Sequence, residues 1–159
     1  SSLGVSCVHS DAELPAAVTC AAQYDARVLA EPWVSGRELT VGIVSGKALP
    51  VLMVKAAGQF YDYDAKYKDV TTTYHLVTAP AVQRMALQAF TALGCTHWGR
   101  VDLIEDAEGR CYLLELNTIP GLTDHSLVPK AAAHDDLSYE QLVLAILASS
   151  MEPSGDASH

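Results

Sequence analysis

The chain is poor in basic residues. Its 10 lysines and arginines are outnumbered by 19 aspartates and glutamates, which gives a formal net charge of −9. A surface with this balance repels phosphates, so we expect no nucleic acid partner. The sequence also has no apolar run near the ~20 residues that span a bilayer, and no charged-then-apolar leader opens it. We therefore expect no membrane partner.

Cysteine and histidine motifs are missing as well. The four cysteines are scattered without a C-x-x-C pair, which excludes a typical zinc site and a dense disulfide framework. No two histidines have metal-ligand spacing on one expected element. Reduced thiols in a cytosol are the simplest interpretation.

The sequence does contain enough apolar residues for one core, since 50% of its 159 residues are hydrophobic. No internal repeat and no long linker divides it. We expect one domain over residues 1–150, followed by a polar tail over residues 151–159.

Periodicity and turn signals predict the elements of the first half. Residues 11–23 are rich in alanine and have helical spacing, and the stretch "RVLAEPWV" is typical of a strand that Pro32 ends. An alternating stretch predicts a hairpin with strands 38–44 and 48–54 around Ser45-Gly46. Residues 58–74 follow neither period, which predicts a long ordered or closing loop of a kind that is usually functional or mobile.

The second half opens and closes with helices. Apolar residues from Val82 to Leu93 recur at helical spacing before Gly94, which predicts an amphipathic helix whose stripe lies in the core. Near the end, Ser138 and Gln141 form a capping box before a last helix.

Between these helices, the stretch "WGRVDLIEDAEGRCYLLELNT" predicts a second hairpin. A two-residue turn at Glu108-Gly109 would place Asp102 opposite Glu115 and Arg100 opposite Asn117. The period of two puts these four polar side chains on one face of the sheet. The other face would then be apolar, with Val101, Leu103, Leu114 and Leu116.

The polar face has a specific chemistry. Two carboxylates that face each other across a ladder repel, so they call for a cation. Hard oxygen ligands suit Mg²⁺, and Arg100 beside them suits an anionic phosphoryl oxygen. The alternative is the wet face of an ordinary edge hairpin. Asn117 favours the metal site, because asparagine is rare inside strands.

Several motifs together resemble the D-alanine–D-alanine ligase family of the ATP-grasp superfamily. They run in the family's order along the whole chain except its tail, as "SSLGVS", "AEPWVSGRELTVGI", "FYDYDAKY", "LGCTHWGRVD", "LLELNTIPGLTDHSLVP" and "LSYEQLVLAIL". The resemblance implies an α+β fold, the carboxy-terminal subdomain of ATP-grasp, with an antiparallel sheet flanked by helices and a long active-site loop.

The resemblance also implies an activity. Family members join two D-alanines for peptidoglycan precursors, using ATP to form an acyl phosphate and releasing ADP. By motif match, Asp102, Glu115 and Asn117 are expected to bind two Mg²⁺ ions, for which Mn²⁺ can substitute. Arg100 is expected to steady the phosphoryl group and the tetrahedral intermediate.

The loop "IPGLTDHSL" is expected to hold the second D-alanine. Gly121 resembles the backbone donor to the developing oxyanion, although a plain turn would also explain it. Ser126 and Leu127 resemble the residues that receive the substrate carboxylate, through a hydroxyl and a backbone N–H. A serine in this position would equally be only a helix N-cap.

The nucleotide contacts are also implied by the resemblance. Ser1 and Ser2 resemble the end of a phosphate-binding loop. In the closing loop over the active site, Lys66 is expected near the ATP phosphates and Tyr67 near the substrate pocket. The adenine and ribose contacts are expected from Glu31, Pro32, Trp33, Val34 and Glu38. By themselves, Trp33 and Val34 are also typical core residues.

Family members are about twice as long as this chain, so we expect the amino-terminal domain to be absent and activity to need more than these residues. Two alternatives remain: another ATP-grasp carboxylate–amine ligase, or a non-catalytic Mg-nucleotide-binding fragment that needs a partner chain. The family resemblance further implies that the protein is located in a bacterial cytoplasm and that D-alanine and ATP are its small-molecule partners. It also allows the complete enzyme to form a homodimer.

Overall fold

The computed structural model describes residues 3–55 and 73–151 of the chain. By its contacts the chain divides into two compact units, one with residues 1–34 and 56–72 and one with residues 35–55 and 73–159. The predictions for Ser1, Ser2, Lys66, Tyr67, the loop up to residue 72 and the tail from residue 152 lie outside the described residues.

In the first unit, the described residues form one helix, α1 (Leu14–Ala21). It is shorter than the expected 11–23, because Glu13 is already the N-cap residue and Ala22 is the C-cap. The expected strand over "RVLAEPWV" is wrong. A strand needs a hydrogen-bonded neighbour, and no described strand pairs with this stretch, in which Leu29 is 83% exposed.

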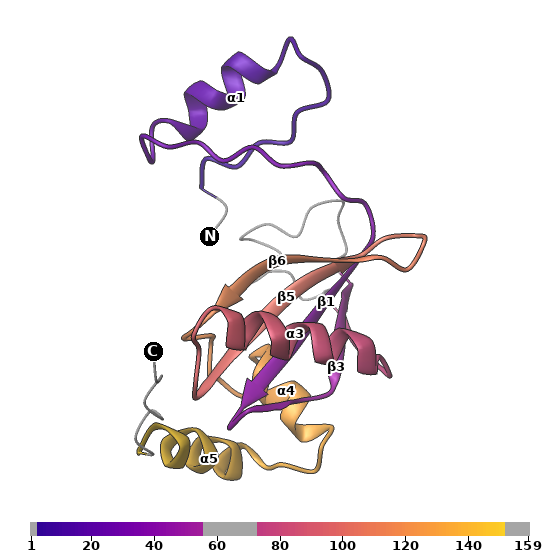
Figure 1. Ribbon diagram of the computed structural model, residues 1–159, viewed down its shortest axis with the longest axis vertical. Coiled ribbons are helices and arrows are strands. Elements are labelled where there is room, and N and C mark those ends of the chain that lie inside the picture. Colours follow the sequence, from indigo (N-terminus) through magenta and orange to yellow (C-terminus); the bar gives the residue numbers. More distant parts are fainter. Residues whose placement is uncertain (1–2, 56–72, 152–159) are drawn as a thin grey trace. The chain divides into compact units, whose positions relative to one another are not determined.

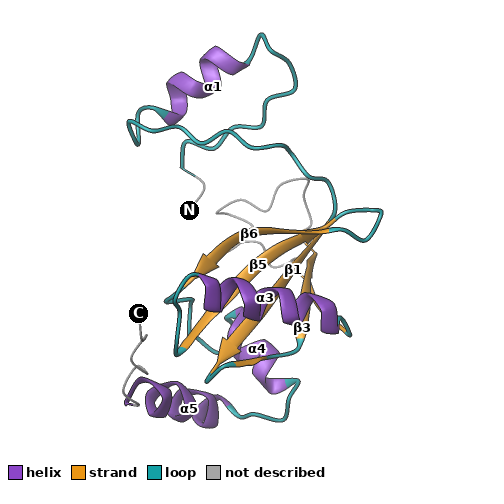
Figure 2. Ribbon diagram, viewed as in Figure 1, coloured by secondary structure: helices purple, strands orange, loops and turns teal. Residues whose placement is uncertain are grey.

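The second unit is built on an antiparallel, six-stranded sheet with the order β4-β3-β1-β5-β6, in which β2 pairs only with β1 (Figure 1). The strands are β1 (Arg37–Val44), β2 (Lys47–Ala48), β3 (Val51–Lys55), β4 (Thr73–Val77), β5 (Trp98–Glu105) and β6 (Cys111–Asn117). The helices are α3 (Pro80–Ala92), α4 (Leu127–Ala133) and α5 (Tyr139–Met151). Figure 2 shows helices on both faces of this sheet, as expected.

The first hairpin is confirmed around Ser45-Gly46, whose φ angles of 49° and 72° are the two left-handed conformations that a tight hairpin turn requires. Its second strand is divided, because Pro50 has no N–H to give to the ladder. As a result, β2 and β3 pair with β1 in registers that differ by one residue. The predicted end of the long loop, at residue 74, is too late, because β4 already begins at Thr73.

One face of the sheet is apolar and is covered by α3. The core on this side joins Val82, Ala86 and Phe90 of α3 to the odd-numbered residues of β1 and β5. The predicted helix and its end at Gly94 (φ 72°) are confirmed. The last residue of the predicted apolar stripe, Leu93, is not in the core: it follows the last helical turn and is 69% exposed.

The opposite face is covered by α4 and α5, whose core residues include Val128, Ala131 and Leu142. Gly42 permits this close packing, since a Cβ there would lie 3.3 Å from the Val128 side chain. The predicted capping box is confirmed: the Ser138 N–H donates to Gln141 Oε1 at 2.8 Å, and the Gln141 N–H donates to Ser138 Oγ at 3.3 Å. Before it, Asp136 takes a left-handed conformation (φ 54°) that glycine adopts more readily.

On this face α4 packs on β1 and β3. Further along the same face, β5 and β6 carry the polar side chains of Arg100, Asp102, Glu115 and Asn117. None of the helices in the described ranges is both long and apolar enough to cross a bilayer.

The core assignment of β5 can be tested with two matched truncations. Leu103 is 0% exposed, so Leu103→Ala should lower the free energy of unfolding by about 2–5 kcal/mol. The same change at Leu147, which is 56% exposed, should alter it by no more than about 0.5 kcal/mol. Urea unfolding followed by circular dichroism measures both, and equal losses would contradict the assignment.

Candidate functional site

The register of β5 and β6 brings the predicted polar residues together. Arg100 pairs with Asn117 and Asp102 pairs with Glu115, as expected. These positions lie on the sheet face that α4 and α5 partly cover, opposite the apolar core of α3. The sheet therefore collects two carboxylates, an amide and a guanidinium on adjacent strands.

The predicted turn, in contrast, is wrong. Asp106 and Arg110 close a longer turn through a backbone hydrogen bond of 3.0 Å, with Gly109 left-handed at φ 79°. The Asp106 carboxylate stabilises it by accepting the N–H groups of Glu108 and Arg110 at 3.0 and 2.9 Å. This turn offsets the pairing by one residue.

A bulge restores the expected pairing farther along the ladder. Leu103 pairs with Leu113 but Asp102 pairs with Glu115, so Leu114 is the extra residue. The Leu114 side chain is 49% exposed, so its predicted place on the apolar face stays a prediction.

Asp102 is the centre of the cluster. Arg100 approaches it with both arms of its guanidinium, from Nε to Oδ1 at 2.8 Å and from Nη2 to Oδ2 at 2.7 Å. This bidentate pair is mostly shielded, with side chains 15% and 18% exposed. Charge-assisted, two-point hydrogen bonds of this kind fix the carboxylate plane as well as neutralising its charge.

Asn117 joins the two carboxylates. Its Nδ2 donates to Asp102 Oδ2 at 3.3 Å and to Glu115 Oε1 at 3.2 Å. Both contacts use the amide nitrogen, so neither of them occupies the side-chain carbonyl oxygen of Asn117. Asn117 thus holds two like charges close together while presenting a further hard oxygen.

Thr40 completes the cluster and was not predicted. It lies on β1 opposite Asp102, and its hydroxyl donates to Asp102 Oδ1 at 2.6 Å. A polar residue between the apolar Leu39 and Val41 was the available signal. The partner could not be inferred, since no local turn sets the register between β1 and β5.

The composition of the cluster suits magnesium better than a softer metal. Among the described residues, no three histidines, cysteines or carboxylates gather as a metal-binding group. Two carboxylates and an amide oxygen fit Mg²⁺, which takes few protein ligands and completes its octahedron with water and phosphate oxygens. Glu38 lies on the same strand as Thr40, two residues away, at a half-buried position.

The loop after β6 brings Gly121 next to Ser126. A Cβ on Gly121 would lie 2.9 Å from Ser126 Oγ. That hydroxyl accepts the Thr123 N–H at 3.0 Å and lies 2.9 Å from Thr123 Oγ1. Ser126 is the N-cap residue of α4, but its side chain makes no capping hydrogen bond. Ser126 thus takes the N-cap position that the alternative predicts, but its hydroxyl does not cap the helix.

Neighbouring contacts hold this loop against the helices. The Tyr139 hydroxyl donates to the Leu122 carbonyl at 2.7 Å, and the half-buried Leu127 packs against the core under α4.

On α4, Lys130 Nζ lies 3.9 Å from the centre of the Tyr74 ring. Burial lowers the pKa of Lys130.

The expected adenine contacts belong to the first unit. Glu31 and Pro32 are exposed, Trp33 is 61% exposed and Val34 is half-buried. The alternative that Trp33 is a core residue is thus wrong. The two units are described separately, so a nucleotide pocket that joins these residues to the cluster stays a prediction.

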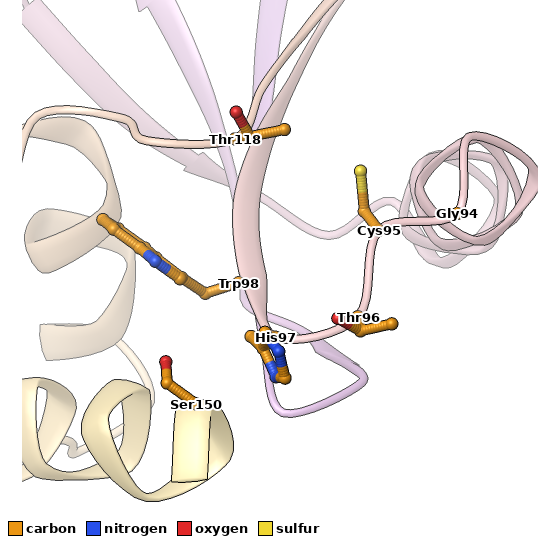
Figure 3. Close-up of a pocket in the computed structure, with 7 residues that line it drawn as sticks. All are labelled: Gly94, Cys95, Thr96, His97, Trp98, Thr118 and Ser150. Carbon is orange, nitrogen blue, oxygen red and sulfur yellow. The ribbon is translucent and has the colours of Figure 1, made fainter. Parts of the chain in front are cut away.

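A pocket of about 310 Å³ lies at the start of β5. Figure 3 shows Trp98 on the α5 side of the strand and Cys95 on the α3 side. None of the predicted site residues lines it. Its lining consists of Gly94, Cys95, Thr96, His97, Trp98, Thr118 and Ser150.

Comparison with known proteins gives one consistent family. Residues 1–148 match the family described as the D-ala D-ala ligase C-terminus. The D-alanine–D-alanine ligase of Saccharophagus degradans is 48% identical over 157 residues, which are 95% of this chain and 50% of that protein. The chain spans about half the length of the curated relatives that it matches.

Solved structures agree. A crystal structure of the Bacillus anthracis D-alanine–D-alanine ligase complexed with ATP has a TM-score of 0.76 and 34% identity, over 91% of this chain and 49% of that one. The VanG D-Ala:D-Ser ligase of Enterococcus faecalis has a TM-score of 0.79 and 28% identity, over 93% and 46%. The sheet and its flanking helices are therefore the ligase fold.

The contact between Gly121 and Ser126 can be tested by a double-mutant cycle. Gly121→Ala should lower the free energy of unfolding by about 1 kcal/mol, because the new Cβ displaces the Ser126 hydroxyl from Thr123. In a Ser126→Ala background that oxygen is absent, so the same change should have little further effect. Urea unfolding of the four proteins measures the coupling, and additive losses would contradict the contact.

Proposed function

Because this chain belongs to the D-alanine–D-alanine ligase C-terminal family, we propose that it is the carboxy-terminal ATP-grasp part of an enzyme that joins two D-alanines. The reaction uses ATP, passes through an acyl phosphate and releases ADP, and its product serves peptidoglycan precursor synthesis. The observation that carries this proposal is the convergence of Arg100, Asp102, Glu115 and Asn117 on one face of β5 and β6.

Asp102, Glu115 and Asn117 would hold two Mg²⁺ ions, with Mn²⁺ as a substitute. The donor set supports this, since its hard oxygens lie on neighbouring strands and one amide joins both carboxylates. When bound, Mg²⁺ neutralises charge on the ATP phosphates and on the transferring phosphoryl group.

Arg100 has a different role in this proposal. Its guanidinium is a planar fork that binds oxyanions at two points. Held on β5 beside Asp102, it would orient the anionic oxygens of the acyl phosphate and of the tetrahedral intermediate. Fixed positive charge at the place where negative charge develops is the main source of catalysis in such reactions.

The loop after β6 would bind the acceptor D-alanine. The Gly121 N–H is the proposed donor to the oxyanion, while the Ser126 hydroxyl and the Leu127 N–H receive the substrate carboxylate. The close approach of Gly121 to Ser126 supports this division of roles, because one short loop supplies both groups. The Ser126 hydroxyl is also not used as a cap for α4.

The ATP contacts remain those that the family motifs imply. We propose Ser1, Ser2 and Lys66 for the phosphates, the segment from Glu31 to Val34 for adenine and Glu38 for the ribose, with Tyr67 closing the substrate pocket. The Bacillus anthracis relative was solved with ATP. A bacterial cytoplasm and a homodimer of the complete enzyme belong to the same proposal.

A second candidate is a fragment that binds Mg-nucleotide without catalysing ligation by itself. It is favoured by the length of the chain, which covers about half of its curated relatives. D-alanine-dependent ADP release should therefore be measured for this chain alone and for a protein of full ligase length that contains it. Release only by the longer protein is expected. Its absence from both would exclude the ligase, and release with D-serine or D-lactate as the better acceptor would indicate a related ligase.

The metal assignment predicts a change in magnesium dependence. In the ligase-length protein, Glu115→Gln should raise the Mg²⁺ concentration for half-maximal ADP release by about 10-fold or more, the loss that even outer partners of metal ligands produce. Its melting temperature should stay within about 2 °C.

Glu108→Gln provides a matched control on the same hairpin. Glu108 pairs with Arg110 in the turn, and its side chain is 65% exposed. This variant should keep the magnesium dependence of the unchanged protein. An unaltered magnesium dependence in Glu115→Gln would remove Glu115 from the metal site.

A further inference from the structure

Thr40 is a buried polar residue in the middle of the sheet. It is 3% exposed, and its neighbours Leu39 and Val41 on β1 are 1% and 0% exposed. Its hydroxyl donates to Asp102 Oδ1 at 2.6 Å, directly across the β1–β5 ladder. Short O–H···O⁻ bonds of this kind are among the stronger hydrogen bonds in proteins.

Packing alone does not explain a threonine at this position. Valine has nearly the same shape and the same preference for strands. It would fill the space beside Leu52, the cross-strand partner on β3 that is 0% exposed, without burying a hydroxyl. The property that threonine adds is a donor directed at the carboxylate.

The contacts of Asp102 divide between its two oxygens. Oδ1 accepts from Thr40 and, at 2.8 Å, from Arg100 Nε, while Oδ2 accepts from Arg100 Nη2 and the Asn117 amide and lies a longer 3.2 Å from Arg100 Nε. Asn117 also contacts Glu115, so Oδ2 is the oxygen on the side of the other proposed metal ligands. Thr40 therefore holds Asp102 by the oxygen farther from them.

We propose that Thr40 is a positioning residue for the metal site, which fixes Asp102 through Oδ1 and leaves Oδ2 directed at the cation. This inference rests on the proposed function. In that function the Arg100 guanidinium also orients phosphoryl oxygens, so its hydrogen bonds to Asp102 are shared with a second task. Thr40 keeps its bond, because its strand is buried between two helical layers and its β-branched side chain is stiff.

The test compares three substitutions in the ligase-length protein. Thr40→Val and Thr40→Ala remove the hydroxyl with and without retaining the side-chain volume, whereas Thr40→Ser retains the hydroxyl. Calorimetric titration of Mg²⁺ into protein saturated with the β,γ-imido analogue of ATP, without D-alanine, measures cation binding in the absence of turnover. Magnesium dependence of ADP release then separates KM for Mg²⁺ from kcat.

Both hydroxyl-free variants should weaken Mg²⁺ binding about 10-fold or more, as removal of an outer partner of a metal ligand does. Thr40→Ser should stay much closer to the unchanged protein. The loss should appear mainly in KM for Mg²⁺, with kcat largely recovered at high Mg²⁺. Partial unfolding would not produce that division.

Two outcomes would overturn the inference. One is Mg²⁺ affinity in Thr40→Val equal to that of the unchanged protein. The other is an equally large loss in Thr40→Ser, which would assign the effect to packing. An unchanged protein that binds Mg²⁺ with the analogue but releases no ADP with D-alanine would instead overturn the proposed ligase function, and the calorimetric comparison would still decide the role of Thr40.

Discussion

Two carboxylates that face each other across one ladder are the constraint around which this site is organised. Asp102 and Glu115 are cross-strand partners, and like charges in that relation destabilise a sheet. The chain offsets this with groups of its own: the Arg100 guanidinium neutralises Asp102, and the Asn117 amide donates to both carboxylates. The same arrangement is suited to a cation and an anion together, since a carboxylate pair attracts the first and a guanidinium the second.

The rest of the unit makes that arrangement rigid. The face of the sheet toward α3 is apolar and supplies a core that fixes β1 and β5. The opposite face is only partly covered, by α4 and α5 packed over β1 and β3. Polar side chains on β5 and β6 are therefore anchored from behind by a close-packed layer. The loop to α4 begins at the end of β6, which brings the Gly121–Ser126 contact into the same subdomain.

The pairing of Asp102 with Glu115 was predictable, although for a reason that was partly mistaken. The expected two-residue turn at Glu108-Gly109 would give this register directly. In the structure a longer turn displaces it by one residue, and the bulge at Leu114 returns it. The alternation of apolar and polar residues decided the register. A shift of one residue, from the longer turn without the bulge or from the bulge without the longer turn, would have exposed apolar side chains of β6 to solvent.

The sequence by itself determined local features: three of the four described helices, the capping box at Ser138 and the end of α3 at Gly94, the Ser45-Gly46 turn, the strands of both hairpins, and the residue types of a magnesium and phosphate site. These follow from backbone preferences and from periodicity, which act over a few residues. The tertiary structure decided the contacts between distant segments: Thr40 with Asp102, Lys130 with Tyr74, and the lack of a partner for the stretch before β1 among the described strands. Such contacts depend on which strands become neighbours, and that is settled by how whole layers bury their apolar faces.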